Sequence, residues 1–374
     1  MNTHHMRNTI LLLLVLGPAA QAPAQLMPRA NLYSSYTTNL FQNYNQQAAW
    51  ITHAFIDLDL APSQALNLYY TGSANVFTEY EDLFSHTHRA GLSYVRPGED
   101  LNLLYVGTEL ALRLDRPLYD YRDFLQAEAY ATAKVYLRPT LLSRTGYSLR
   151  YQEYLNAGDY SFFEQEAFAQ LSRFFSTRTT LQWHGELGLK TYARNTNTLA
   201  STGPTRSGGD RNLVQLMSRF KVAQSLGAST GLQLEYLERV NLAGQSRYTV
   251  EQIYNPDDDL FDDRYSYDGN EFRTTLKHLA PWGLQVEMSG RSERRRYAGR
   301  PALGLEGFTL ESGETRRDSR NSLSLGAEKS LYLESEWVQE IRLQLEWLYS
   351  HIDSNDLYYQ TDVQVYSTGI QIDF

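Results

Sequence analysis

The sequence of 374 residues contains no cysteine. This absence excludes a disulfide scaffold, a zinc site built on thiolates, a cysteine nucleophile and a lipid anchor on an N-terminal cysteine. Long apolar runs are also missing. The longest, residues 10–16, is far shorter than the roughly 20 residues of a membrane-spanning helix, which excludes a helical membrane protein. The formal net charge of −9 gives no indication of nucleic-acid binding.

The first 24 residues have the order of a secretory signal peptide. Arg7 lies in a polar region, residues 10–16 are apolar, Gly17 and Pro18 interrupt them, and small residues fill most of positions 19–24. Cleavage after Ala22 or Ala24 fits this pattern. We therefore expect export across the inner membrane and a mature chain, residues 25–374, that forms a single domain. The alternative is a short buried strand at the N-terminus.

Apolar and polar residues alternate along most of the remaining chain. Residues 126–137, 181–190 and 340–349 each place apolar side chains at every second position, which is the period of a β-strand. The alternating segments run for about ten to fifteen residues. Ordinary strands are about five or six residues long, whereas tilted transmembrane strands need about nine to eleven. The pattern favours a membrane barrel.

Proline is absent from the alternating segments. The eight prolines beyond Pro28 fall in tight connections (62, 97, 139 and 281) or in longer polar ones (117, 204, 256 and 301). A proline inside a barrel strand would remove a ladder hydrogen bond where lipid offers no replacement. Short turns near 61, 97, 140, 176, 225, 281 and 334 separate longer loops. This predicts an all-β, antiparallel up-and-down transmembrane barrel of about 16 strands, with 14 as the alternative count.

The chain end shows a specific motif. Tyr366, Thr368, Ile370, Ile372 and the terminal Phe374 occupy every second position. This segment resembles the C-terminal strand of bacterial outer-membrane β-barrel proteins, whose terminal aromatic and alternating apolar residues are read by the barrel-assembly machinery. The resemblance covers the last nine residues as a motif and the mature chain as an architecture. It implies residence in a Gram-negative outer membrane and names no solute. The alternative is an ordinary edge strand that ends in Phe.

The resemblance implies an assembly signal and a set of partners. We expect Tyr366, Ile370, Ile372 and Phe374 to form the assembly signal. The expected partners are the barrel-assembly machinery during biogenesis, together with outer-membrane lipid and lipopolysaccharide.

In a barrel, the polar face of each strand points into the lumen. The candidate lumen-lining residues are Glu109, Arg113, Glu128, Lys134, Glu186, Lys190, Arg239, Arg273, Glu287, Arg291, Arg295, Arg342 and Glu346. Charges at membrane depth are tolerated where they face water or each other, and about sixteen strands leave room for an aqueous channel. We therefore expect a porin-like channel for small polar solutes. The alternative is a closed structural or secretion-accessory barrel with a salt-bridged lumen, in which Arg291 and Arg295 would pair with carboxylates such as Glu287, Glu328 or Glu346.

The longest loop, residues 241–268, is the candidate for a segment that folds into the lumen, because the third loop, residues 115–122, is too short to narrow a pore. The longest loop also contains Asp257, Asp258, Asp259, Asp262 and Asp263. Carboxylates at this density form a weak candidate site for Ca²⁺, or for a Ca²⁺ bridge to lipopolysaccharide. The alternative is a solvated acidic loop.

A cluster of arginines follows residue 290. The alternation places Arg291 and Arg295 inward, and Arg294 and Arg296 outward near the outer rim. There the outward pair could contact phosphate groups of surface glycolipid. The alternative is that these arginines are simply solvated.

Outer-membrane hydrolases are the contrasting class of function. His351 with Asp353 could polarise a nucleophile, but the adjacent Ser350 faces the opposite side of the strand. His86 and His88 share a face on the lipid side, near a rim. We expect neither an enzyme nor a cofactor.

Overall fold

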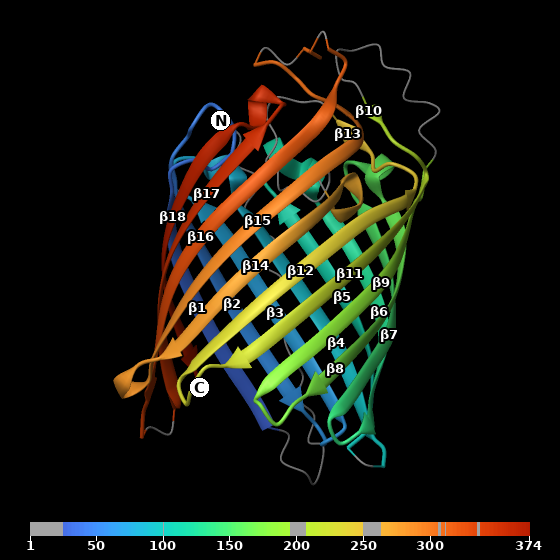
Figure 1. Ribbon diagram of the computed structural model, residues 1–374. Helices are drawn as coiled ribbons and strands as arrows, with labels where there is room; N and C mark the ends of the chain where they lie inside the picture. The colour runs from blue at the N-terminus through green and yellow to red at the C-terminus, as the bar shows by residue number, and fades with distance from the viewer. Residues whose placement is uncertain are drawn as a thin grey trace, which may run out of the picture.

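A computed structural model describes residues 25–99, 101–194, 207–249, 263–305, 308–310, 312–334 and 337–374. The predicted signal peptide, residues 1–24, lies outside these ranges. Sixteen antiparallel strands close into one barrel (Figure 1). The first eight are β1 (Gln25–Thr37), β2 (Ala49–Ala61), β3 (Leu66–Phe77), β4 (Ser85–Pro97), β5 (Leu103–Asp115), β6 (Phe124–Arg138), β7 (Leu141–Tyr154) and β8 (Phe162–Phe174). The next eight are β9 (Thr179–Tyr192), β11 (Asn212–Ser225), β12 (Thr230–Ala243), β14 (Asp268–Leu279), β15 (Leu284–Pro301), β16 (Thr315–Tyr332), β17 (Glu340–Ser354) and β18 (Thr361–Asp373).

Each barrel strand pairs with its neighbours in chain order, and β1 pairs with β18 to close the ring. The closing register runs from Arg29 opposite Asp373 to Thr37 opposite Val365. Short turns lie at the lower end of the barrel in Figure 1 and the long loops at the upper end. The predicted up-and-down barrel of sixteen strands is therefore confirmed, with turns and loops where the sequence pattern placed them.

The long connections contain short additional elements. β10 (Ser207–Gly208) and β13 (Tyr248–Thr249), which the sequence pattern did not indicate, form a separate two-stranded sheet above the barrel. The 3₁₀ turns are η1 (Glu81–Leu83), η2 (Pro117–Arg122), η3 (Gly158–Tyr160), η5 (Arg264–Ser266), η6 (Pro281–Gly283) and η7 (Leu357–Tyr359). Within the described ranges, no helix is long and apolar enough to cross a membrane.

The outer face of the barrel is apolar and exposed. On β5 the outward side chains include Leu104 and Leu110, on β11 Phe220, and on β17 Leu343 and Leu345, all exposed. A soluble protein rarely exposes a continuous apolar belt, since contact of such a surface with water is unfavourable. Lipid removes this cost, and charged residues of the same strands face the interior. The fold is therefore that of a transmembrane β-barrel.

Glycines on the inner face lie directly opposite aromatic rings. Gly107 faces Tyr130 across β5 and β6, Gly146 faces Phe168 across β7 and β8, and Gly369 faces Tyr33 across the closing seam. A Cβ added at Gly369 would come within 2.4 Å of the Tyr33 ring. The ring can lie flat over the strand only because Gly369 has no side chain. The pair therefore packs the seam that joins the first and last strands.

We expect Gly369→Val to lower the free energy of unfolding by about 1 to 3 kcal/mol, the usual range for overpacking, because the new side chain displaces the Tyr33 ring. Urea unfolding of the barrel in phospholipid vesicles measures this. Gly326→Val on β16 is the control, since a Cβ there has its nearest atom at 3.9 Å. Equal stability of the two variants would contradict the packing role of Gly369.

Candidate functional site

Part of the charged inner face of the barrel is in contact with water. Among the inward side chains, Arg89 of β4 keeps 50%, Arg273 of β14 41% and Lys277 of β14 57% of its surface exposed. A packed interior would bury groups at these positions almost completely. The exposed fractions show that water reaches the inner face at these positions, whereas Glu164, Lys190 and Glu293 are almost completely buried.

Most inward charges pair along the wall. On β4 and β5, Arg89 Nη1 lies 3.7 Å from Glu109 Oε1, and Tyr69 Oη donates a hydrogen bond to Glu109 Oε2 at 3.0 Å. Glu128 of β6 lies opposite Glu109 in the register. Two carboxylates therefore face each other on this part of the wall, with Arg89 beside one of them.

A second group of wall charges lies on β14 and β15. Arg291 Nη2 lies 2.8 Å from one oxygen each of Glu271 and Glu293. Arg273 pairs with Glu271 at 2.9 Å, and Arg295 pairs with Glu293 at 2.9 Å. Arg291 and Arg295 therefore use Glu271 and Glu293 as partners, in place of the carboxylates suggested by the closed-lumen alternative.

The other predicted lumen residues also lie on the inner face. Their contacts are Arg113 with Asp115, Lys134 with the ring of Tyr136, Arg239 with Tyr267 Oη, Glu287 with Lys277, and Arg342 with Glu328 and Glu340. Glu346 lines a hollow of about 230 Å³ together with Glu287 and Glu328. Apart from Tyr267, which directly precedes β14, the partners lie on the same strand or on strands adjacent in the barrel. They brace the wall laterally and do not cross the lumen.

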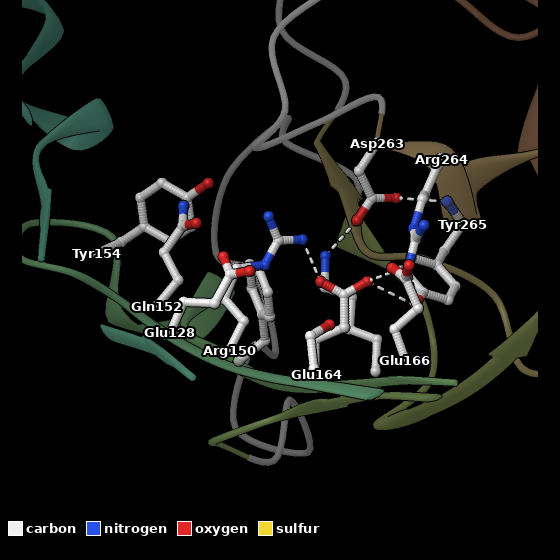
Figure 2. A pocket seen from close by; sticks show the side chains of 12 residues that line it. Glu128, Arg150, Gln152, Tyr154, Glu164, Glu166, Asp263, Arg264 and Tyr265 are labelled. Carbon is white, nitrogen blue, oxygen red and sulfur yellow. Dashed lines mark hydrogen bonds and ion pairs between the residues drawn. The ribbon is translucent and has the colours of Figure 1, made fainter. Parts of the chain in front are cut away.

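The end of the longest loop, residues 263–266, folds into the barrel. Arg264 Nη2 lies 2.6 Å from Glu164 Oε1 and 2.8 Å from Glu166 Oε2, both on β8. The same guanidinium also pairs with Glu186 of β9. Arg264 directly precedes β14, which is three positions from β9 and four from β8 in the barrel order. The loop therefore reaches past β11 and β12 to its binding site on the wall (Figure 2).

Neighbouring residues of the loop add to this attachment. Asp263 pairs with Lys190 of β9, and Tyr265 Oη donates a hydrogen bond of 2.6 Å to Glu164. Burial opposes the charge on Arg264, but the carboxylate of Glu164 and the other acidic groups around it raise its pKa above the ordinary value. Arg264 therefore stays charged, and four ion pairs hold the segment against β8 and β9.

A cavity of about 390 Å³ lies beside the loop segment, between it and the wall. Arg150, Glu128, Lys190 and Arg264 are among its lining residues, and Figure 2 shows carboxylates and guanidinium groups around one space. Arg150 also pairs with Glu164. The volume is within the range of small-molecule sites, and the lining is polar and of both signs. The cavity can therefore accommodate a small polar solute.

Aromatic side chains narrow the mouth above this cavity. One buried cluster joins Tyr154 of β7, Phe162 of β8 and Tyr192 of β9 with Tyr358 and Tyr359 of η7. Since η7 leads into β18, the cluster links nearly opposite sides of the barrel. A second cluster packs Leu40, Leu83 and Tyr119 from the first three loops against Ala49 at the start of β2. Aromatic packing and the Arg264 segment therefore both occupy the interior of the barrel toward its loop end.

The sequence indicated part of this constriction. The longest loop was the candidate for folding inward, and its described end does so. Arg264 was not singled out, because loop residues have no periodicity that predicts a direction. Asp263, a proposed metal ligand, pairs with Lys190, whereas Asp257, Asp258, Asp259 and Asp262 lie outside the described residues. The described part of the chain contains no group of three side chains suited to a metal ion.

The histidines do not form the arrangement considered for catalysis. His351 Nδ1 lies 2.9 Å from Asp362 of β18. The sequence had suggested Asp353 as its partner instead. Asp362 also accepts a hydrogen bond of 2.7 Å from Tyr349. His86 Nδ1 and His88 Nε2 lie 3.0 Å apart on the outer face. Cross-strand register, which sequence spacing does not reveal, brings His351 to Asp362.

A buried carboxylate at the mouth makes stability depend on pH. Burial raises the pKa of Asp356 to about 6, although Arg316 and Arg300 oppose this shift. The folded state therefore binds the proton more tightly than the unfolded chain, whose aspartates titrate near 3.9. The stabilising contribution of this proton is complete below about pH 4 and is lost as the pH rises through 6.

We expect the free energy of unfolding of the wild type to fall by about 2 kcal/mol between pH 4 and 7, relative to Asp356→Asn. Urea unfolding of both proteins across this range measures the difference. Asp353→Asn, at an exposed position of β17, is the control for loss of a carboxylate. Parallel pH profiles of the wild type and Asp356→Asn would contradict the role of Asp356.

Comparison with known proteins shows similarity of fold. No family model and no curated protein matches the sequence. Among solved structures, OpdK of Pseudomonas aeruginosa with vanillate is 10% identical, with 93% of this chain and 98% of that chain covered and a TM-score of 0.51. OccD3 (OpdP) of the same organism is 9% identical, with 93% and 91% covered and a TM-score of 0.51. A second structure, titled as the outer membrane protein OpdK, is 10% identical, with 94% and 99% covered and a TM-score of 0.50. The predicted class, a bacterial outer-membrane β-barrel, is confirmed at the level of the fold.

Proposed function

We propose that this protein is an outer-membrane channel for small polar solutes. The observation that supports the proposal best is the water-exposed charge of the inner face, where Arg89, Arg273 and Lys277 keep between 41% and 57% of their surface. Charged side chains at this depth are stable next to an aqueous path. The ion pairs between wall strands join neighbouring strands and do not bridge the lumen. The proposal includes no catalytic step and no cofactor.

The proposed selectivity element is the Arg264 segment. Its guanidinium faces Glu164, Glu166 and Glu186 on one side of the lumen, and the 390 Å³ cavity lies beside it. A solute passing this point meets fixed charges of both signs within a narrow space. Neutral or zwitterionic polar solutes fit such a lining better than large ions of one sign, because both ends of the molecule find a partner.

The second candidate function is a closed barrel with a structural role. The aromatic cluster that joins β7, β8 and β9 to η7 favours it, since this cluster spans the mouth. In a closed barrel, Arg264 would complete the plug and its removal would create a path that the wild type lacks. The two candidates therefore predict different behaviour of the wild type in a planar bilayer.

We expect the wild type to conduct ions in a planar bilayer and Arg264→Gln to conduct severalfold more, with a shift of selectivity toward cations. The reason is that the variant releases the loop and leaves Glu164, Glu166 and Glu186 without their shared cation. Single-channel conductance and reversal potential in a salt gradient measure both effects. The potential of the exposed carboxylates acts over about 8 Å at physiological salt.

Lys277→Gln is the matched control. It removes an inward cation that pairs with Glu287 of β15 at 2.7 Å. Lys277 lies near the turn end of β14, whereas the loop segment precedes the other end of this strand. Exposed pairs of this kind contribute little to stability, so the loop should stay in place and conductance should change little. A silent wild type next to a conducting Arg264→Gln would support the closed barrel. Equal conductance of wild type and Arg264→Gln would show that the segment is no constriction.

A further inference from the structure

Three arginines gather on the outer face of the barrel near its loop end. Arg294 and Arg296 of β15 and Arg317 of β16 are all exposed. They line a hollow of about 550 Å³ together with Asn270, Ser319 and Asp353. Two further lining residues, Arg295 and Asp318, pair with Glu293 and Arg316. Among the residues that line the hollow, the three outward arginines outnumber the one outward carboxylate, Asp353.

These arginines form a like-charged group across β15 and β16, and one carboxylate lies beside it. Asp268 of β14 is opposite Arg296 in the register and accepts a hydrogen bond from the backbone N–H of Asn241. Arg296 lies directly opposite Arg317 in the register of β15 and β16, and Arg294 lies opposite Ser319. Like charges directly opposite each other destabilise a sheet. In the described part of the chain, no carboxylate forms an ion pair with Arg294, Arg296 or Arg317, whereas the inward arginines of the same strand are paired. An external anion between the guanidinium groups would remove this repulsion.

The position along the membrane normal identifies the kind of anion. The outward face of β15 is apolar at Leu284, Val286 and Met288. This apolar stretch begins just after the lower turn. Ten residues separate Leu284 from Arg294, or about 34 Å along the strand and about 26 Å along the normal at a tilt of about 40°. The apolar band of such barrels is about 25 Å tall. Arg294 therefore lies at the level where lipid headgroups begin.

An aromatic ring lies directly below the arginines. Phe272 of β14 is 50% exposed on the outer face. It lies opposite Ser292, one outward position below the Asn270 and Arg294 pair. A ligand at this place would contact an apolar ring and acyl chains below and guanidinium groups above. This geometry fits an amphipathic anion rather than a free one, and arginine binds phosphate through two parallel hydrogen bonds.

We propose that the hollow formed by Arg294, Arg296 and Arg317 is a binding site for the phosphate group of an outer-leaflet glycolipid of the lipid A type. The phosphate lies between Arg296 and Arg317, and Arg294 binds the same headgroup from the lower side. The site is independent of the proposed channel, because its side chains point away from the lumen. Bound lipid neutralises the repulsion between the two opposed arginines and anchors β15 and β16 at the outer boundary.

The test measures binding of bisphosphorylated lipid A and of its dephosphorylated form to the purified barrel in detergent micelles, with divalent cations chelated. We expect the wild type to bind the bisphosphorylated form at least about tenfold more tightly. The double variant Arg296→Gln and Arg317→Gln should lose this preference, since two charge-assisted contacts to phosphate are removed. Thermal unfolding of both proteins verifies that the variant is folded.

Arg96→Gln is the matched control, because Arg96 is an exposed outward arginine of β4 at the opposite end of the barrel. It should retain the full preference. Equal binding of the two lipid forms by the wild type would overturn the proposal, and so would an unchanged preference in the double variant. Inorganic phosphate is the third probe. If it competes at concentrations similar to those of lipid A, the site is one for free phosphate and the glycolipid assignment is wrong.

Discussion

The constraint on which the whole structure depends is the need to pair every backbone N–H and C=O group that lies in lipid. Closure by β1 and β18 meets it, because it leaves no strand edge within the membrane. Once the sheet is closed, the period of two along each strand divides side chains between lipid and lumen. Exposed Leu104 and charged Glu109, both on β5, illustrate this division. Charge on the inner face is therefore a consequence of closure.

Burial determines which inner charges brace the wall and which hold the loop. Arg89 and Lys277 stay exposed, and their pairs contribute little energy. Glu164, by contrast, is only 4% exposed and receives Arg150, Arg264 and Tyr265. Leaving a carboxylate of this kind unpaired costs several kcal/mol. The loop segment therefore supplies a cation, Arg264, to this buried carboxylate. Attachment of the loop and stability of the wall depend on each other.

The two faces of β15 both carry arginines, but in different environments. Arg291 and Arg295 face the lumen and are neutralised within the protein by Glu271 and Glu293. Arg294 and Arg296 face outward, beyond the apolar band, where the headgroup layer supplies anions. The chain neutralises these inner charges by itself, whereas the outward arginines are the ones for which we propose an external phosphate.

The sequence by itself determined the barrel, a count of about sixteen strands with fourteen as the alternative, and the face of most strand charges. Alternation, proline placement and the terminal Phe374 are local features of the sequence. They are sufficient to indicate an up-and-down barrel, because each of its strands shows the same period of two. Only the tertiary structure decided which charges meet. Arg291 pairs with Glu271 and Glu293, and His351 with Asp362, because register brings those residues together across strands. Arg264 reaches β8 from a loop without periodicity, so no pattern in the sequence could give its direction. Pairing across the barrel depends on distances between residues far apart in the chain, and these exist only once the ring has closed.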